Sequence, residues 1–442
     1  MIDYLLYILV LTAYAPGIIY IIRYREIFIY PIISFCFLGM FIFNAVGSII
    51  IINREYPMLS GSIVTPQYIG ILILQVCIFY LIAWPYINWR KASLPKINVN
   101  FANEYIFLII IGLLTFTILF LYYKEVGNFL IFELIKGNMN HANLLKYREL
   151  TYGLINFKYY RLGFLVFPSI LSAHIFLIDS FQNCFKIFHL FIISICLIPP
   201  ILLGEKSGIL YITIILIICY SVNLSVKKKS FIEFFKLKTI IAILSALIPT
   251  ILIYQLYYSG LAKTFKFSKL IYRIVGVYSE SIALSVKYVE NNGKLLGKTL
   301  PTIKGLLKHN RFNIETALHK YLSSLFGDIH TTTTTLKGNI PFSAVTEGYI
   351  NFGWIGVAIF SSVSFLTLIV FQEVFLRIKL GVLSYTLMVW YAYLALNLSM
   401  YSAFYTIFSI IHTLVCIGLI CLYSAIVFIN KRVEFKRYYS IR

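Results

Sequence analysis

Charged residues are scarce in this sequence, and their scarcity excludes most soluble proteins. Only 12% of the 442 residues are Asp, Glu, Lys or Arg, whereas 60% are hydrophobic. Soluble globular chains carry about 25% charged and 45–50% apolar residues, so this chain lacks the polar surface that a soluble protein of its length needs. We therefore expect a polytopic helical membrane protein, because about 20 consecutive apolar residues span a bilayer as a helix.

Aspartate is rarer still, with Asp3, Asp179 and Asp328 as the only three in the chain. No DxD motif for a metal-bound nucleotide sugar is therefore possible, and neither GxxxxGK[ST] nor HExxH occurs. Asp179 falls just outside an apolar run, so we expect no acid deep in the membrane. These absences disfavour a nucleotide-driven pump, a zinc protease, a nucleotide-sugar transferase and an ion-coupled transporter.

Cysteine motifs are also missing. The seven cysteines form no CxxC pair and no His/Cys cluster, and six of them lie inside apolar runs. A disulfide framework or a zinc site is therefore not expected. We expect the chain to use no metal and no cofactor.

Long apolar runs are what the sequence does contain, and they predict an all-α fold with about eleven membrane-spanning helices. The runs lie at residues 4–22, 28–52, 68–87, 105–123, 162–178, 187–203, 209–225, 239–258, 348–371, 382–400 and 405–429. This pattern predicts an N-terminal bundle of eight spans over 1–258 with an outer loop at 124–161. A large extracytoplasmic loop over 259–344 and a C-terminal bundle of three spans with a basic tail over 345–442 would follow.

The basic residues give the expected orientation. The net charge is +21, and 18 of the 38 Lys and Arg residues fall on alternate loops and on the C-terminal tail. Cytoplasmic loops are rich in Lys and Arg, so we place the C-terminus in the cytoplasm and the N-terminus outside. Membrane topology thus accounts for the positive charge on these loops and on the tail, and nucleic acid is not an expected partner.

Two outer segments are basic as well, which topology does not explain. Segment 124–161 holds six Lys and Arg residues, and segment 259–344 holds twelve against four acids. In the second segment, apolar residues recur at helical spacing, which predicts amphipathic helices on the outer membrane face. The basic excess then has two interpretations: contact with lipid head groups, or binding of an anionic ligand.

If the ligand is anionic, the residues that could bind it or react with it are the candidate site residues. Four cations are expected at or outside the outer face, and they would suit the oxygens of a pyrophosphate: Arg148, Lys206, Arg273 and Arg311. A hydroxyl nucleophile would also need a base. His330, in the sequence Gly-Asp-Ile-His before a threonine run, is the best placed, and Glu280 and Glu347 are carboxylate alternatives. We interpret His174, His189 and His412, at or within the spans, as structural.

Three short motifs resemble those of the Wzy-type O-antigen polymerases. The first is Glu347-Gly-Tyr-Ile-Asn-Phe-Gly-Trp-Ile-Gly356, which opens a span after the large outer loop. The second is Gly204-Glu-Lys-Ser-Gly208 between two spans, where that family often has a Gly-x-Arg-x-Gly-like turn. The third is Arg273, followed by a helix and then by Gly293-Lys-Leu-Leu-Gly297. The number of spans and the position of the dominant outer loop agree with the family.

The resemblance implies a GT-C-like, metal-independent, inverting glycosyltransferase of the bacterial inner membrane. Its donor would be an oligosaccharide on undecaprenyl pyrophosphate, and its partners would be membrane lipids, a flippase and a chain-length regulator. Arg273 matches the pyrophosphate-binding arginine of the family, Lys206 stands where the family usually has arginine, and His330 matches the loop histidine that acts as base in the related ligases.

Two other functions remain open from the sequence. An O-antigen ligase would use the same chemistry with a different acceptor. A polysaccharide flippase would carry out no chemistry, and the scarcity of charge within the spans and the lack of a repeat between the two halves argue against it. A non-catalytic membrane scaffold is the residual case.

Overall fold

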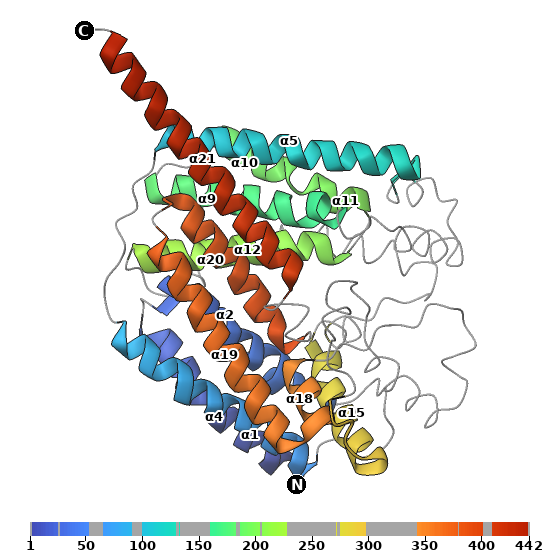
Figure 1. Ribbon diagram of the computed structural model, residues 1–442. Helices are drawn as coiled ribbons and strands as arrows, with labels where there is room; N and C mark the ends of the chain where they lie inside the picture. Colours follow the sequence, from blue (N-terminus) through green and yellow to red (C-terminus); the bar gives the residue numbers. More distant parts are fainter. Residues whose placement is uncertain are drawn as a thin grey trace. The chain divides into compact units, whose positions relative to one another are not determined.

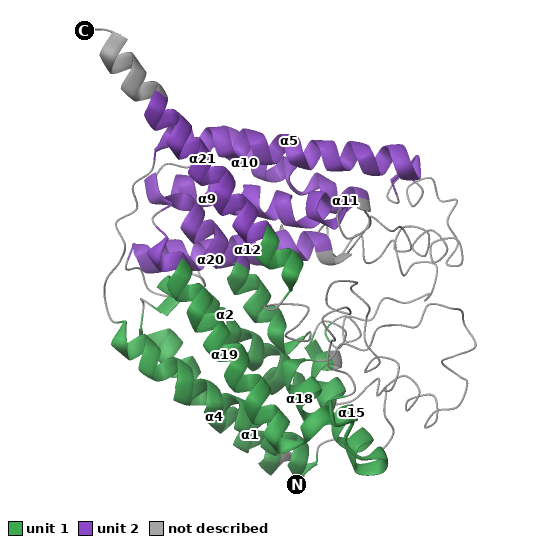
Figure 2. Ribbon diagram, viewed as in Figure 1, with its two compact units in different colours: residues 1–93, 266–374, 391–414 green, residues 94–265, 375–390, 415–442 purple. Residues whose placement is uncertain are grey.

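The computed structural model describes a chain of helices, with no strand among the residues it describes. Those residues are 2–24, 27–52, 65–90, 100–129, 132, 160–182, 186–203, 206–227, 271, 275–297, 343–378, 380–400 and 409–440. The chain divides into two compact units, which Figure 2 colours separately. The first comprises 1–93, 266–374 and 391–414, and the second comprises 94–265, 375–390 and 415–442. The three consecutive segments expected from the sequence stay a prediction, because most of 259–344 lies outside the described residues.

The helices of the first unit come from both ends of the chain (Figure 1). They are α1 (Ile2–Arg23), α2 (Pro31–Met40), the π-helix η2 (Phe41–Val46), α3 (Gly47–Ile52), α4 (Pro66–Trp89), α15 (Val277–Asn292), α18 (Ala344–Phe352) and most of α19 (Trp354–Arg377), with short 3-10 helices η1 (Ile27–Ile29) and η7 (Asn397–Ser399). The sequence marks several of these starts. Thr65 caps α4 by accepting a hydrogen bond from the Tyr68 amide, and Pro66 follows at the first helical position, where its missing N–H costs nothing.

Helices α4 and α19 run parallel within this unit. Near their starts, Trp354 lies against Gly70, where an added Cβ would be 2.6 Å from the indole. Halfway along, the rings of Phe79 and Phe365 meet edge to face. Contacts at both ends therefore fix the register of the pair.

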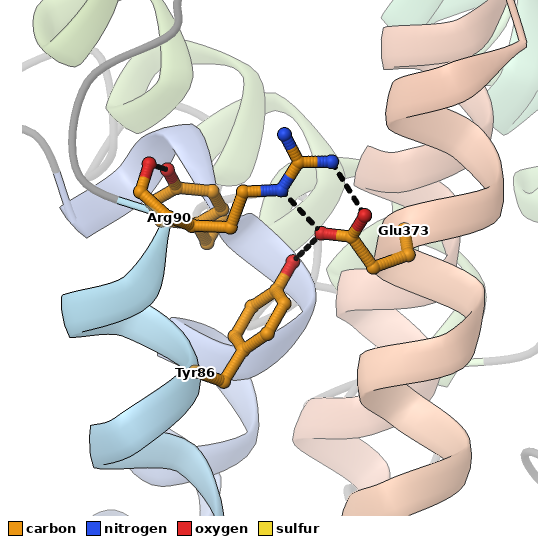
Figure 3. Close-up of polar contacts among 4 residues, drawn as sticks. Tyr86, Arg90 and Glu373 are labelled. Carbon is orange, nitrogen blue, oxygen red and sulfur yellow. Dashed lines mark hydrogen bonds and ion pairs between the residues drawn. The ribbon is translucent and has the colours of Figure 1, made fainter.

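An ion pair joins the far ends of these two helices (Figure 3). The Arg90 guanidinium donates to both carboxylate oxygens of Glu373, at 2.7 and 2.5 Å, and the Tyr86 hydroxyl donates to the same carboxylate at 2.6 Å. The hydrogen bonds to Glu373 raise the pKa of Arg90 above its ordinary value, and partial burial opposes that shift only in part. A forked arginine–carboxylate pair fixes geometry as well as charge.

The second unit contains α5 (Phe101–Val126), the π-helix η3 (Leu162–Val166), α9 (Phe167–Gln182), α10 (Ile187–Ile195), α11 (Ile198–Leu203) and α12 (Lys206–Val226), with parts of α20 (Val382–Leu396) and α21 (Ile410–Ser440). Helices α5 and α9 are antiparallel. Tyr122, near the end of α5, packs on Phe164 in η3, whereas Glu104, near the start of α5, bonds His174 in α9. Gly163 permits the close approach, because a Cβ there would be 2.6 Å from Ile118.

Nine helices in the described part of the chain are long and apolar enough to cross a membrane. They overlap nine of the eleven predicted runs and confirm a multi-pass helical membrane protein. The predicted run at 348–371 was wrong at its start, because Gly353 ends α18 there and the span begins at Trp354. The run at 187–203 is instead broken into α10 and α11, whose bend at Cys196 and Leu197 precedes Pro199 and Pro200. The run at 239–258 lies outside the described residues.

Candidate active site on helices α15 and α18

Most of the predicted site residues lie outside the described part of the chain. These are Arg148, Arg273, Arg311 and His330. Lys206 is described as the first residue of α12, although its side chain is not. Gly208, in the same predicted turn, lies against Pro200, where a Cβ would be 2.6 Å from the proline Cβ. Lys206 belongs to the second unit, whereas the carboxylates Glu280 and Glu347 belong to the first.

Helix α18 is built by the motif that contains Glu347. The Ser343 side chain caps the helix by accepting a hydrogen bond from the Thr346 amide. Glu347 follows in the first turn and is only 3% exposed. The free N–H groups at a helix start stabilise a negative charge, so this position favours the ionised carboxylate.

The glycines of the same motif allow α18 and α19 to fold back on each other. Gly353 has a φ of +66°, which favours glycine, and ends α18 directly before Trp354. The backbones of Gly348 and Gly356 then touch, because a Cβ on Gly348 would be 2.5 Å from the Gly356 carbonyl oxygen. The spacing of the motif is therefore the spacing of a tight turn between two helices.

Three hydrogen bonds join α18 to the segment that follows α15. The amides of Leu295 and Leu296 donate to the carbonyls of Ile350 and Asn351, both at 3.0 Å. The Gly297 amide donates to the side-chain oxygen of Asn351, also at 3.0 Å. Asn351 is fully buried, and its side-chain nitrogen donates to the Glu347 carbonyl. The segment Gly293–Gly297 and the segment Glu347–Gly356, both singled out in the sequence, are thus in direct contact.

Left-handed backbone at three positions makes this contact possible. Gly293, Leu296 and Gly297 have φ values of +73°, +50° and +84°. Glycine adopts such angles without penalty, whereas leucine is strained there. The chain therefore leaves α15 through a compact turn that faces α18.

Glu280 occupies the first turn of α15 and is 3% exposed. Its neighbour Ser279 bonds the Tyr68 hydroxyl of α4 and donates to the Asn44 carbonyl at 3.3 Å. Asn44 lies in the π-helix η2, a distortion that is frequent at functional sites. A second buried carboxylate thus stands at a helix start, next to a buried polar cluster.

Two opposing effects act on the carboxylates of Glu280 and Glu347. Both lie in first turns, and the capped start of α18 favours a negative charge on Glu347, whereas burial disfavours the charged form of both. Between the two helices, burial and, to a lesser extent, the nearby Glu290 raise the pKa of Tyr349 above its ordinary value, so this phenol stays neutral. A carboxylate in its ionised form can accept a proton from a hydroxyl nucleophile.

Sequence reasoning missed a buried ionisable cluster in the second unit. Asp179 was expected outside the membrane span, but it lies within α9 and is fully buried. Glu104 and His174 are also fully buried, and the His174 Nε2 atom lies 2.7 Å from a Glu104 carboxylate oxygen. The predicted spans began at 105 and ended at 178, one residue short of each acid. Helices α5 and α9 extend further and enclose them.

His189 is likewise part of this polar region. Its Nδ1 atom lies 2.6 Å from Asp179, and its Nε2 atom lies 3.2 Å from the Tyr105 hydroxyl. The exposed Lys186 ammonium donates to the same hydroxyl at 3.3 Å. Two acid–histidine pairs, Glu104–His174 and Asp179–His189, are thus buried in the second unit, which weakens the scarcity of buried charge as an argument against transport.

Comparison with known proteins gives no match, whether against family models, curated proteins or solved structures, so the site itself carries the argument about function.

Proposed function

We propose that this protein polymerises oligosaccharide repeat units carried on undecaprenyl pyrophosphate, at the outer face of a bacterial inner membrane. One observation carries the proposal. Two of the three segments that resemble the polymerase family, Gly293–Gly297 and Glu347–Gly356, are bonded to each other and belong to helices that each bear a buried carboxylate.

The proposed reaction is a glycosyl transfer with inversion. An acceptor sugar hydroxyl attacks the anomeric carbon of the donor chain, the bond from that carbon to the pyrophosphate oxygen breaks, and undecaprenyl pyrophosphate leaves. The hydroxyl proton passes to Glu347 or Glu280, with His330 as the third candidate base. Arg273 and Lys206, with Arg148 and Arg311, would stabilise the charge that develops on the pyrophosphate. A flippase and a chain-length regulator would be its partners.

The first test is deletion of the gene, followed by gel analysis of the cell's surface polysaccharide. A polymerase predicts single repeat units in place of a ladder. Polymer that persists on its lipid carrier would mean that the protein is a ligase. An unchanged ladder would contradict the whole assignment.

Substitution of the carboxylates tests the site. Removal of a general base costs about 10²- to 10⁴-fold in rate, so Glu347→Gln or Glu280→Gln should abolish the ladder while the protein level stays normal. Glu290→Gln is the matched control, because Glu290 is on the same α15 but exposed. Arg273→Ala should abolish long polymer as well, and normal chain lengths in that variant would exclude its proposed role.

A second candidate function, a flippase for the same lipid-linked sugar, is favoured by the paired Glu104 and His174 inside the second unit. Ionisable groups within a membrane bundle are characteristic of transport pathways. The same gel separates the two functions, because loss of a flippase leaves unextended repeats on the cytoplasmic side.

A further inference from the structure

Four helices of the second unit meet at one buried polar cluster. Glu104 comes from α5, His174 from α9, Thr386 from α20 and Tyr423 from α21. The first three are fully buried, and Tyr423 is 3% exposed. The polymerase reaction proposed above uses none of these side chains.

The contacts of this cluster leave few ways to place its hydrogens. His174 Nε2 lies 2.7 Å from one Glu104 oxygen, and the Tyr423 hydroxyl donates to the other at 2.6 Å. His174 Nδ1 lies 2.9 Å from the Thr386 hydroxyl oxygen. That hydroxyl is 3.1 Å from the Val382 carbonyl, which can only accept its hydrogen.

When the Thr386 hydroxyl donates its hydrogen to the Val382 carbonyl, the Nδ1 atom of His174 must donate to the Thr386 oxygen. The second ring nitrogen then either donates to an ionised Glu104 or accepts from a protonated one. In both arrangements the pair holds one proton and carries no net charge.

The remaining arrangement has the threonine donate to Nδ1 and the ring donate to an ionised Glu104. It leaves one uncompensated negative charge in a fully buried site, which desolvation strongly disfavours. Within the described residues no lysine or arginine contacts Glu104 or His174 to compensate it.

Two further titratable groups of the described residues lie on the helices that pack against α9. Cys219 of α12 points its sulfur at the Ala173 carbonyl, 3.9 Å away, and His189 of α10 is paired with Asp179 further along α9. The π-helix η3 has only glycine and apolar residues. None of these groups supplies a proton to the pair through a direct contact.

We propose that Glu104 and His174 form a buried proton-binding site that holds one proton between them, and that loss of this proton would leave a net negative charge among α5, α9, α20 and α21. The ligand is the proton itself. This inference is independent of the polymerase proposal.

The test reads the protonation state directly. Full-length protein in lipid nanodiscs is labelled with 13C-alanine, 13C-glutamate and 15N-histidine. The chain contains a single Ala–His step, at Ala173–His174, so the His174 signals are assigned without any substitution. At pH 8, well above the ordinary histidine pKa of about 6.5, we expect either two protonated ring nitrogens on His174 or a protonated carboxyl on Glu104.

A neutral ring beside an ionised carboxylate in the unmodified protein would overturn the proposal. Glu104→Gln removes the carboxylate, so His174 should have a neutral ring at pH 8 and the protonated-ring signals, where the unmodified protein shows them, should disappear. His189→Gln, as the matched control, should leave the His174 signals unchanged. If Glu104→Gln does not fold, the reading from the unmodified protein still decides. The polysaccharide ladder plays no part in this readout, so failure here and failure of the polymerase proposal are separate outcomes.

Discussion

Gly348 and Gly356 lie so close together that neither position has room for a methyl group. The atoms that a Cβ would meet at Gly348 are backbone atoms of Gly356, which no rotamer change can move aside. Most glycines inside helices only weaken them, by about 1 kcal/mol relative to alanine. Here the same residue is what allows α18 and α19 to pack.

Gly348→Ala should therefore destabilise the protein in spite of the better helix propensity of alanine. Overpacking costs about 1–3 kcal/mol, and we expect a lower midpoint of thermal unfolding in detergent. Gly112→Ala is the control, because Gly112 lies in α5 with no atom within 4 Å of the added Cβ. An unchanged midpoint for Gly348→Ala would contradict the close packing.

At the scale of elements, one side chain contributes to the joint between α15 and α18 beside two backbone hydrogen bonds. The Asn351 side chain accepts from the Gly297 amide and donates to the Glu347 carbonyl, so it bonds the turn after α15 and the helix that bears the carboxylate. The first of these contacts is partly buried and the second is buried, so loss of either partner costs stability.

Asn351→Ala should lower the free energy of unfolding by about 0.5–1.5 kcal/mol, because the partly buried Gly297 amide loses its partner. Hydrogen exchange at residues 293–297 should also become faster. Asn292→Ala provides the comparison, since Asn292 is exposed and bonds only the Tyr288 carbonyl of its own helix. Equal effects of the two changes would show that the joint is not held by Asn351.

Sequence reasoning found the helices but misjudged their ends. Hydropathy locates the middle of an apolar run, and nine of eleven runs are indeed long apolar helices. It cannot tell whether a helix continues past its last apolar residue, because the partners of buried Glu104, His174 and Tyr423, lie far away in the sequence. The glycine motif was recognised, but its reason, a backbone contact between two helices, exists only in the fold. The roles of all four basic site residues, including Lys206, stay predictions.

For the whole molecule, the testable property is its orientation in the membrane. In a cysteine-free background, Asn292→Cys should react with a membrane-impermeant maleimide in intact spheroplasts, because α15 is expected outside. Lys431→Cys, exposed on α21, should react only after lysis. Labelling of both positions from the same side would exclude the proposed topology.

The joint between α15 and α18 also has a consequence for the 45 residues between Gly297 and Ser343. Gly297 is bonded to Asn351, and Ser343 caps the other end of the same nine-residue helix. The two residues that flank this segment, Gly297 and Ser343, are therefore separated by about the length of α18, roughly 13 Å at 1.5 Å per residue. The entropy of closing the loop is offset by contacts outside the loop itself. A single proteolytic cut within residues 298–342 would leave both new ends attached to the same support, and the segment could vary in length without loosening the carboxylates beside it.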